Sequence, residues 1–192
     1  MRAVALYFLL LVFPFAVQAE NEKIEGGFGI DLGQKIEEKN LPQDLAMARL
    51  EGNNDEVIYG FTPQHPYEPL SEYRVYVTPR SGRVYRIEAE GYFRKRESCV
   101  EELELLEDIL TRKYGKKNYD AGVRFTDLDV INFGGKNRKI IVKCSGYFTK
   151  HKLKLSYVDR NLMKDAKQEA KKPHKRDGRE ADNAEERDAR GL

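Results

Sequence analysis

Residues that carry much of enzyme and metal chemistry are scarce in this chain. Its 192 residues include only two cysteines and three histidines. Cys99, Cys144 and His151 lack the fourth ligand that a tetrahedral metal site would need. The cysteines do not have Cys-x-x-Cys spacing, and no serine, histidine and carboxylate stand out together as a catalytic set. We therefore expect no metal and no cofactor, and we favour a non-catalytic role.

Signals of nucleotide and nucleic-acid binding are also missing. The segment GFGIDLG, from Gly27 to Gly33, lacks the Lys-Ser/Thr ending of a phosphate loop and the glycine spacing of a dinucleotide site. Its glycines are typical of a strand that bends and packs closely. The formal charge is +2 and falls to +1 without Arg2, so charge gives no reason to expect a nucleic-acid partner.

No apolar run in the sequence reaches the length of a membrane span. Val4 to Val17 is nearly all apolar, but it has about 14 residues, whereas a helix needs roughly 20 to cross a bilayer. Arg2 precedes this run, and the small residues Val17 and Ala19 lie three and one residues before the expected cleavage after Ala19, as in a signal-peptidase site. We expect residues 1–19 to be a signal peptide, and the mature protein to be periplasmic or secreted without a membrane span.

The other end of the chain is charged and has few large apolar side chains. Residues 159–192 hold ten Lys or Arg and nine Asp or Glu. Residues 159–172 have the pattern of a helix that Pro173 would end. Residues 173–192 cannot bury enough surface to offset their ordering entropy, so we predict a disordered charged tail. Residues 20–158 remain as a single domain.

The clearest strand pattern lies in the middle of the chain. YRVYVTP and RVYRIEA flank the turn Arg80-Ser81-Gly82, and apolar residues alternate along both segments. This period of two predicts an antiparallel hairpin with one buried face. The residues expected on that face are Tyr73, Val75, Val77, Tyr85, Ile87 and Ala89.

The clearest helix pattern follows in SCVEELELLEDILTRKYG, residues 98–115. Ser98 and Glu101 have the spacing of a capping box, and Gly115 fits the left-handed residue beyond a helix end. Apolar residues recur at spacings of three and four, which predicts one buried stripe. Its expected members are Val100, Leu103, Leu106, Ile109, Leu110 and Tyr114.

Further strand patterns complete the prediction of the fold class. LAMARL and EVIYGFTP form a candidate hairpin, and VRFTDLDVINF, RKIIVKC and KLKLSYV follow the long helix. A brief polar helix after Leu32 would end at Pro42. Because strands follow one another in antiparallel runs, we predict an α+β fold. It would contain an antiparallel sheet of hairpins, one long amphipathic helix packed on a face, a short N-terminal helix and a C-terminal helix.

The two cysteines favour a disulfide, because an exported protein meets oxidising conditions. A Cys99–Cys144 bridge would close a loop of about 45 residues and stabilise the fold by roughly 4 kcal/mol. The alternative is a small periplasmic hydrolase or thiol enzyme centred on Cys99 or His151. Cys99 lies near basic residues at a predicted helix start, which is an environment that lowers a thiol pKa.

Aromatic and basic residues supply a candidate binding patch. Tyr76 is expected on the face opposite the buried stripe of its strand, and tyrosine is favoured at recognition surfaces. The chain also repeats Gly-Tyr-Phe at 91–93 and 146–148, each time followed by basic residues. We interpret both repeats as corners of the sheet where a strand ends. The candidate patch consists of Arg74, Tyr76, Arg86, Tyr92 and Arg94.

Three segments resemble small, uncharacterised exported proteins of Gram-negative bacteria. They are GGFGIDLGQKI, YRVYVTPRSGRVYRIEA and KYG. The resemblance implies a periplasmic domain and carries over no catalytic residues. A helix with antiparallel strands is also similar to small envelope-assembly lipoproteins and protein β-lactamase inhibitors, although the lipidated cysteine is absent here. We expect the partner to be a protein or an envelope component, and the oligomeric state stays open.

Overall fold

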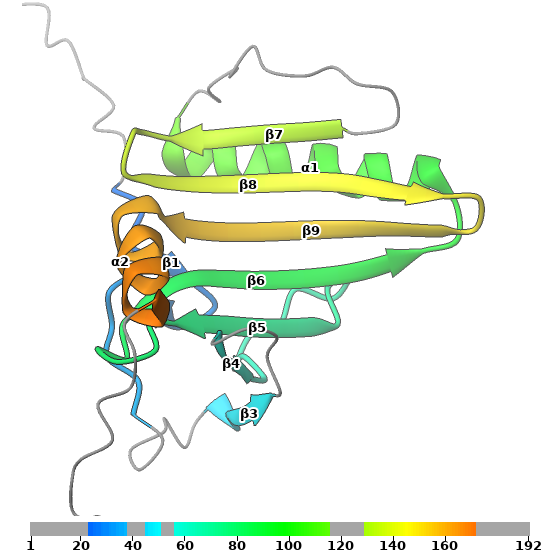
Figure 1. The fold of residues 1–192 in the computed structure, drawn as a ribbon. Coiled ribbons are helices and arrows are strands. Elements are labelled where there is room, and N and C mark those ends of the chain that lie inside the picture. Colours follow the sequence, from blue (N-terminus) through cyan, green and yellow to red (C-terminus); the bar gives the residue numbers. More distant parts are fainter. Residues whose placement is uncertain (1–22, 38–44, 51–55, 116–128, 172–192) are drawn as a thin grey trace, which may run out of the picture.

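The computed structural model describes residues 23–37, 45–50, 56–115 and 129–171. It is a mixed α+β fold with mainly antiparallel sheet and two helices, which confirms the predicted class. The predicted signal peptide at 1–19 and the predicted tail at 173–192 lie outside the described residues. Within them, seven strands form the main sheet in the order β3-β4-β5-β6-β9-β8-β7 (Figure 1).

Every neighbouring pair in this sheet is antiparallel, and the last strand in the sequence, β9, is an inner strand between β6 and β8. Because β9 pairs with both β6 and β8, the halves before and after the first helix form one continuous sheet. The strands are β3 (Ala48–Leu50), β4 (Val57–Gly60), β5 (Glu72–Val77), β6 (Val84–Phe93), β7 (Asp129–Gly134), β8 (Arg138–Tyr147) and β9 (Lys150–Asp159).

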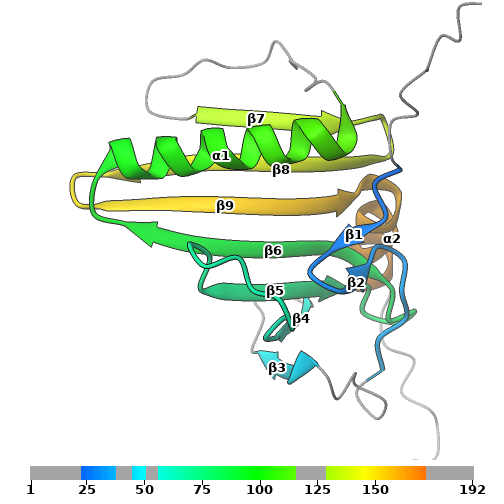
Figure 2. The same ribbon diagram turned by 180° about the vertical axis from the view of Figure 1, so that it is seen from behind.

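Helix α1 (Arg96–Tyr114) packs on one face of the sheet, against β7, β8 and β9 (Figure 2). It begins before Ser98, and its N-cap residue Lys95 makes no side-chain cap, so the predicted capping box is not used. Ile109 is 42 % exposed, contrary to prediction. Gly115 has a φ of 79° and closes the helix through its N–H, as expected. The buried stripe is Cys99, Leu103, Leu106, Leu110 and Tyr114.

An extended N-terminal segment lies on the same face of the sheet, beside the end of α1 (Figure 2). It contains the small hairpin of β1 (Gly26–Gly27) and β2 (Ile30–Asp31). The predicted N-terminal helix is wrong for residues 33–37, which run along the β5–β6 turn, and the remainder of that prediction lies outside the described residues. The Ile36 N–H bonds to the Gly82 carbonyl at 2.8 Å while the Ile36 side chain is buried. Tertiary pairing thus outcompetes the local helix pattern.

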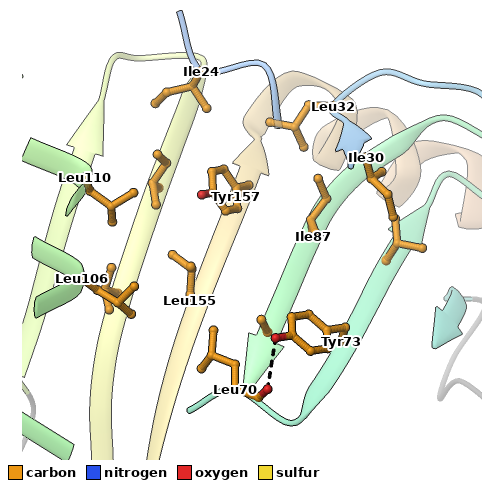
Figure 3. Packing of buried hydrophobic residues seen from close by; sticks show 14 of the residues in the cluster. Ile24, Ile30, Leu32, Leu70, Tyr73, Ile87, Leu106, Leu110, Leu155 and Tyr157 are labelled. Carbon is orange, nitrogen blue, oxygen red and sulfur yellow. Dashed lines mark hydrogen bonds between the residues drawn. The ribbon is translucent and has the colours of Figure 1, made fainter. Parts of the chain in front are cut away.

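The core lies between the sheet, α1 and this N-terminal segment (Figure 3). Ile87 and Leu155, from neighbouring central strands, are almost completely buried there. The Tyr73 hydroxyl donates a hydrogen bond to the Leu70 carbonyl at 3.0 Å, which satisfies its one polar group and holds the loop before β5 against the core. The alternation predicted for β5 is therefore confirmed for Tyr73, which faces the core.

Helix α2 (Arg160–Lys171) lies on the opposite face, at the end of the sheet seen on the left in Figure 1. Asp159 caps it by accepting from the Asn161 and Leu162 N–H groups. Tyr76, Tyr85 and Ala166 form its buried cluster. The prediction that Tyr85 faces the main core is wrong, because the β5–β6 register shifts between Tyr76 and Val77 and turns Tyr85 to the α2 side.

Candidate functional site

The cysteine pair is structural in this fold. Cys99 and Cys144 form a disulfide with Cα atoms 6.0 Å apart, and both residues are buried. The bridge ties the first turn of α1 to β8. No free cysteine occurs among the residues described, so Cys99 offers no thiolate for the alternative enzyme centre.

The other residue of that alternative, His151, supports a turn. Its side chain is buried, and its Nε2 donates to the Phe148 carbonyl at 2.8 Å. This hydrogen bond holds the β8–β9 hairpin from inside. Across the described segments, no cluster of three or more histidines, cysteines and carboxylates could hold a metal ion.

The face of the sheet that carries α2, here called the outer face, has a charge network at its centre. Glu90 is 2 % exposed, yet its carboxylate contacts Arg74 at 3.0 Å, Lys154 at 2.9 Å and Lys152 at 3.3 Å. Burial alone would raise the pKa of Glu90, but the hydrogen bonds and charges of these cations outweigh burial and lower the pKa to about 2. The three cations that contact Glu90 are therefore paired within the protein.

A second buried carboxylate, Glu88, extends this network beneath α2. It accepts a hydrogen bond from the Tyr76 hydroxyl at 2.7 Å and lies 3.4 Å from the Lys154 ammonium. The Arg86 guanidinium stacks on the Tyr76 ring at 3.6 Å from its centre. Burial first, and then the hydrogen bond to Glu88, raises the pKa of Tyr76.

The structure divides the five residues predicted as a binding patch. Tyr76 is 7 % exposed, so the expectation of an exposed ring is wrong for this residue, because α2 covers it. Arg74 and Arg86 lie on the same face but are half-buried in the charge network. Tyr92 is 55 % exposed and Arg94 is exposed, and these two line a groove at the other end of the face.

This groove has a volume of about 730 Å³ and opens between the ends of β6, β9 and β8. The ends of these three strands lie side by side because Tyr92 pairs with Lys152 and Tyr147 pairs with Lys150. Two exposed rings, Tyr92 and Tyr147, therefore flank β9. The lining is Tyr92, Phe93, Arg94, Lys143, Ser145, Gly146, Tyr147, Thr149, Lys150 and Lys152.

The two Gly-Tyr-Phe segments lie where β6 and β8 end, in agreement with their interpretation from the sequence: residues 91–93 are the last of β6, and Phe148 follows Tyr147, the last residue of β8. Gly91 lies in β6, and a Cβ there would meet the Pro69 carbonyl oxygen at 1.9 Å. Gly146 lies in β8, where a Cβ would meet the Lys150 carbonyl oxygen at 2.0 Å. Both positions thus require glycine because backbone passes close by.

The charge of the groove differs from that of the neighbouring network. Among the described residues, Arg94, Lys143 and Lys150 have no carboxylate partner, and the lining itself contains no acidic residue. Lys152 shares Glu90 with other cations. Aromatic rings beside unpaired cations favour an anionic ligand with an apolar part.

Sequence reasoning missed most of the groove. Lys143, Tyr147, Lys150 and Lys152 were not among the predicted site residues, although strict alternation in Lys152–Tyr157 already places Lys152 opposite the buried Leu153. The missing information was the pairing of β9 with both β6 and β8. This pairing brings segments about fifty residues apart in the sequence onto one surface.

Comparisons with family models, with curated proteins and with solved structures found no match to this chain. No helix among the described residues is both long enough and apolar enough to cross a membrane. The class of protein that the fold and the site define is therefore an α+β domain with a disulfide and a basic, aromatic groove.

Proposed function

We propose that this protein is an exported, non-catalytic binding protein that takes an anionic protein or envelope component in the groove. The observation that carries this proposal is the pair of exposed tyrosines, Tyr92 and Tyr147, framed by cations with no carboxylate in the lining. Exposed rings supply contact area at low conformational cost, and unpaired cations supply charge complementarity.

Binding is favoured over catalysis by the groups that line the groove. Ser145 and Thr149 contribute hydroxyls, but the lining has no histidine, cysteine or carboxylate to act as their base. His151 is close in sequence, but it is buried and bonded to the Phe148 carbonyl. The groove thus holds groups that recognise charge and apolar surface, without a nucleophile and base in contact.

Export is supported by two features of different kinds. The first 19 residues have the pattern of a signal peptide. The Cys99–Cys144 disulfide is of the kind that persists in oxidising compartments such as the periplasm. A periplasmic location would place the groove among envelope proteins and the surfaces of both membranes.

Site-specific photo-crosslinking in the cells that make the protein tests this function. Tyr92 and Leu105 would each be replaced by a photo-crosslinking phenylalanine derivative. Position 105 is the matched control for position 92. The two side chains are 54 % and 55 % exposed, but Leu105 lies on α1 at the opposite face. We expect irradiation to give reproducible adducts from position 92 and none above background from position 105.

Charge in the groove provides a second arm of the same experiment. Lys143→Glu reverses one unpaired cation of the lining and should reduce the yield of the position 92 adduct severalfold. Equal adduct yields from positions 92 and 105, or a yield that is unchanged by Lys143→Glu, would contradict the proposal.

A further inference from the structure

The tip of the β8–β9 hairpin presents an aromatic residue that the fold does not use. Tyr147 pairs with Lys150, so Phe148 and Thr149 form a two-residue turn. Phe148 is 96 % exposed and has a φ of 56°. Turns with positive φ at this position normally carry glycine, because a side chain is strained there. Phe148 thus has a strained backbone and an almost fully exposed ring.

Phe28 has a similarly strained backbone, but its ring contributes to the folded core. Phe28 has a φ of 58°, but its ring packs edge-on against Tyr73 at 5.0 Å and Tyr157 at 6.2 Å. Packing in the core compensates for the conformation of Phe28. Among the described residues, no ring contact of this kind compensates Phe148, whose carbonyl accepts a hydrogen bond from His151. The strain at Phe148 therefore points to a role outside the fold.

This tip lies at the end of the molecule where β6 ends and α1 begins (Figure 1). Residues 91–96 contain three basic residues, residues 143–152 contain three more, and neither segment contains a carboxylate. Along the hairpin, the ring of Phe148 comes first, and Lys150, which has no carboxylate partner among the described residues, follows farther from the tip. The order is therefore apolar at the end and positive behind it.

We propose that the hairpin tip docks on an anionic phospholipid bilayer, with the Phe148 ring entering the interface and the basic residues contacting lipid phosphates. This inference rests on the proposed function and identifies its envelope component as lipid. An anionic bilayer complements this order. Its negative headgroups lie outside, where they can contact the basic residues, and its hydrocarbon lies beneath, where it can receive the ring. A single protruding ring suits a deformable lipid surface, whereas a protein partner would need a pocket shaped to receive it.

The absence of tryptophan from the sequence allows a direct test on the full mature chain. Phe148→Trp places one fluorescent reporter at the tip, and Leu105→Trp places one at an exposed site on α1, away from the hairpin tip. Each would be titrated with vesicles of equal parts phosphatidylglycerol and phosphatidylcholine, and with vesicles of phosphatidylcholine alone. Brominated lipid in either vesicle quenches a reporter that enters the interface.

We expect Phe148→Trp to shift its emission to the blue and to be quenched with the anionic vesicles only, while Leu105→Trp responds to neither. Adding Lys150→Gln to Phe148→Trp should weaken the vesicle affinity about fivefold, the usual effect of one cation near an anionic surface. Identical emission of Phe148→Trp in both vesicles, or a response no larger than that of Leu105→Trp, would overturn the lipid inference. Protein adducts from position 92 would then retain the proposed function with a protein partner.

Discussion

The buried carboxylate of Glu90 makes a strong prediction about stability and pH. Its neighbours Arg74, Lys152 and Lys154 hold the pKa of Glu90 at about 2, below the ordinary value of 4.5. Because the folded state favours the ionised form, Glu90 stabilises the fold above the unfolded-state pKa. That stabilisation is lost as the pH falls from about 4.5 towards 2.

The size of this stabilisation follows from the shift in the pKa of Glu90. Lowering the pKa from 4.5 to about 2 corresponds to a stabilisation on the order of 3 kcal/mol at neutral pH. Glu90→Gln removes the charge and leaves three cations close together. We expect it to lower the free energy of unfolding by about this amount at pH 7, and the difference from the parent should shrink towards zero near pH 2.

Urea unfolding followed by circular dichroism, from pH 2.5 to pH 7, measures this difference directly. The matched control is Glu104→Gln, since Glu104 is exposed on α1 and its substitution should change stability by less than about 0.5 kcal/mol. A loss for Glu90→Gln that stays constant across the pH range, or a loss below about 1 kcal/mol at pH 7, would refute the assignment of Glu90 as the centre of the network.

Two further predictions concern the scaffold that positions the groove. Replacing Cys99 and Cys144 together by alanine should lower the free energy of unfolding by about 4 kcal/mol, measured by urea unfolding, and a loss below about 1 kcal/mol would contradict it. Gly91→Ala forces a Cβ against the Pro69 carbonyl and should cost about 1–3 kcal/mol by the same assay. Gly135→Ala, with nothing within 4 Å, is the matched control, and an equal loss there would refute the steric explanation.

Local patterns were sufficient to predict much of the scaffold. The alternation at Tyr73, Val75 and Val77 predicted the orientation of β5 because side-chain direction in a strand depends on period alone. The Cys99–Cys144 pair could be inferred from cysteine count and the expected compartment. Such features depend on neighbours in the sequence or on composition, so a single sequence reveals them.

Features set by tertiary structure could not be predicted in this way. Tyr76 is buried because α2 returns over the sheet, and Tyr85 changes face because the β5–β6 register shifts. The groove also depends on strand order, since β9 brings Tyr92 and Tyr147 to its two sides. A sequence shows which residues alternate, but strand order determines which alternating faces meet.

The strain and exposure of Phe148 provide the most direct test of the account. In Phe148→Gly the turn relaxes, so the free energy of unfolding should rise by about 1 kcal/mol, while the affinity for phosphatidylglycerol vesicles falls about tenfold. Phe28→Gly, which removes a packed ring at a similar φ, should lose stability instead. Opposite changes in stability and vesicle affinity in Phe148→Gly are the predicted result. A Phe148→Gly protein that is less stable and binds the vesicles as the parent does would contradict the account.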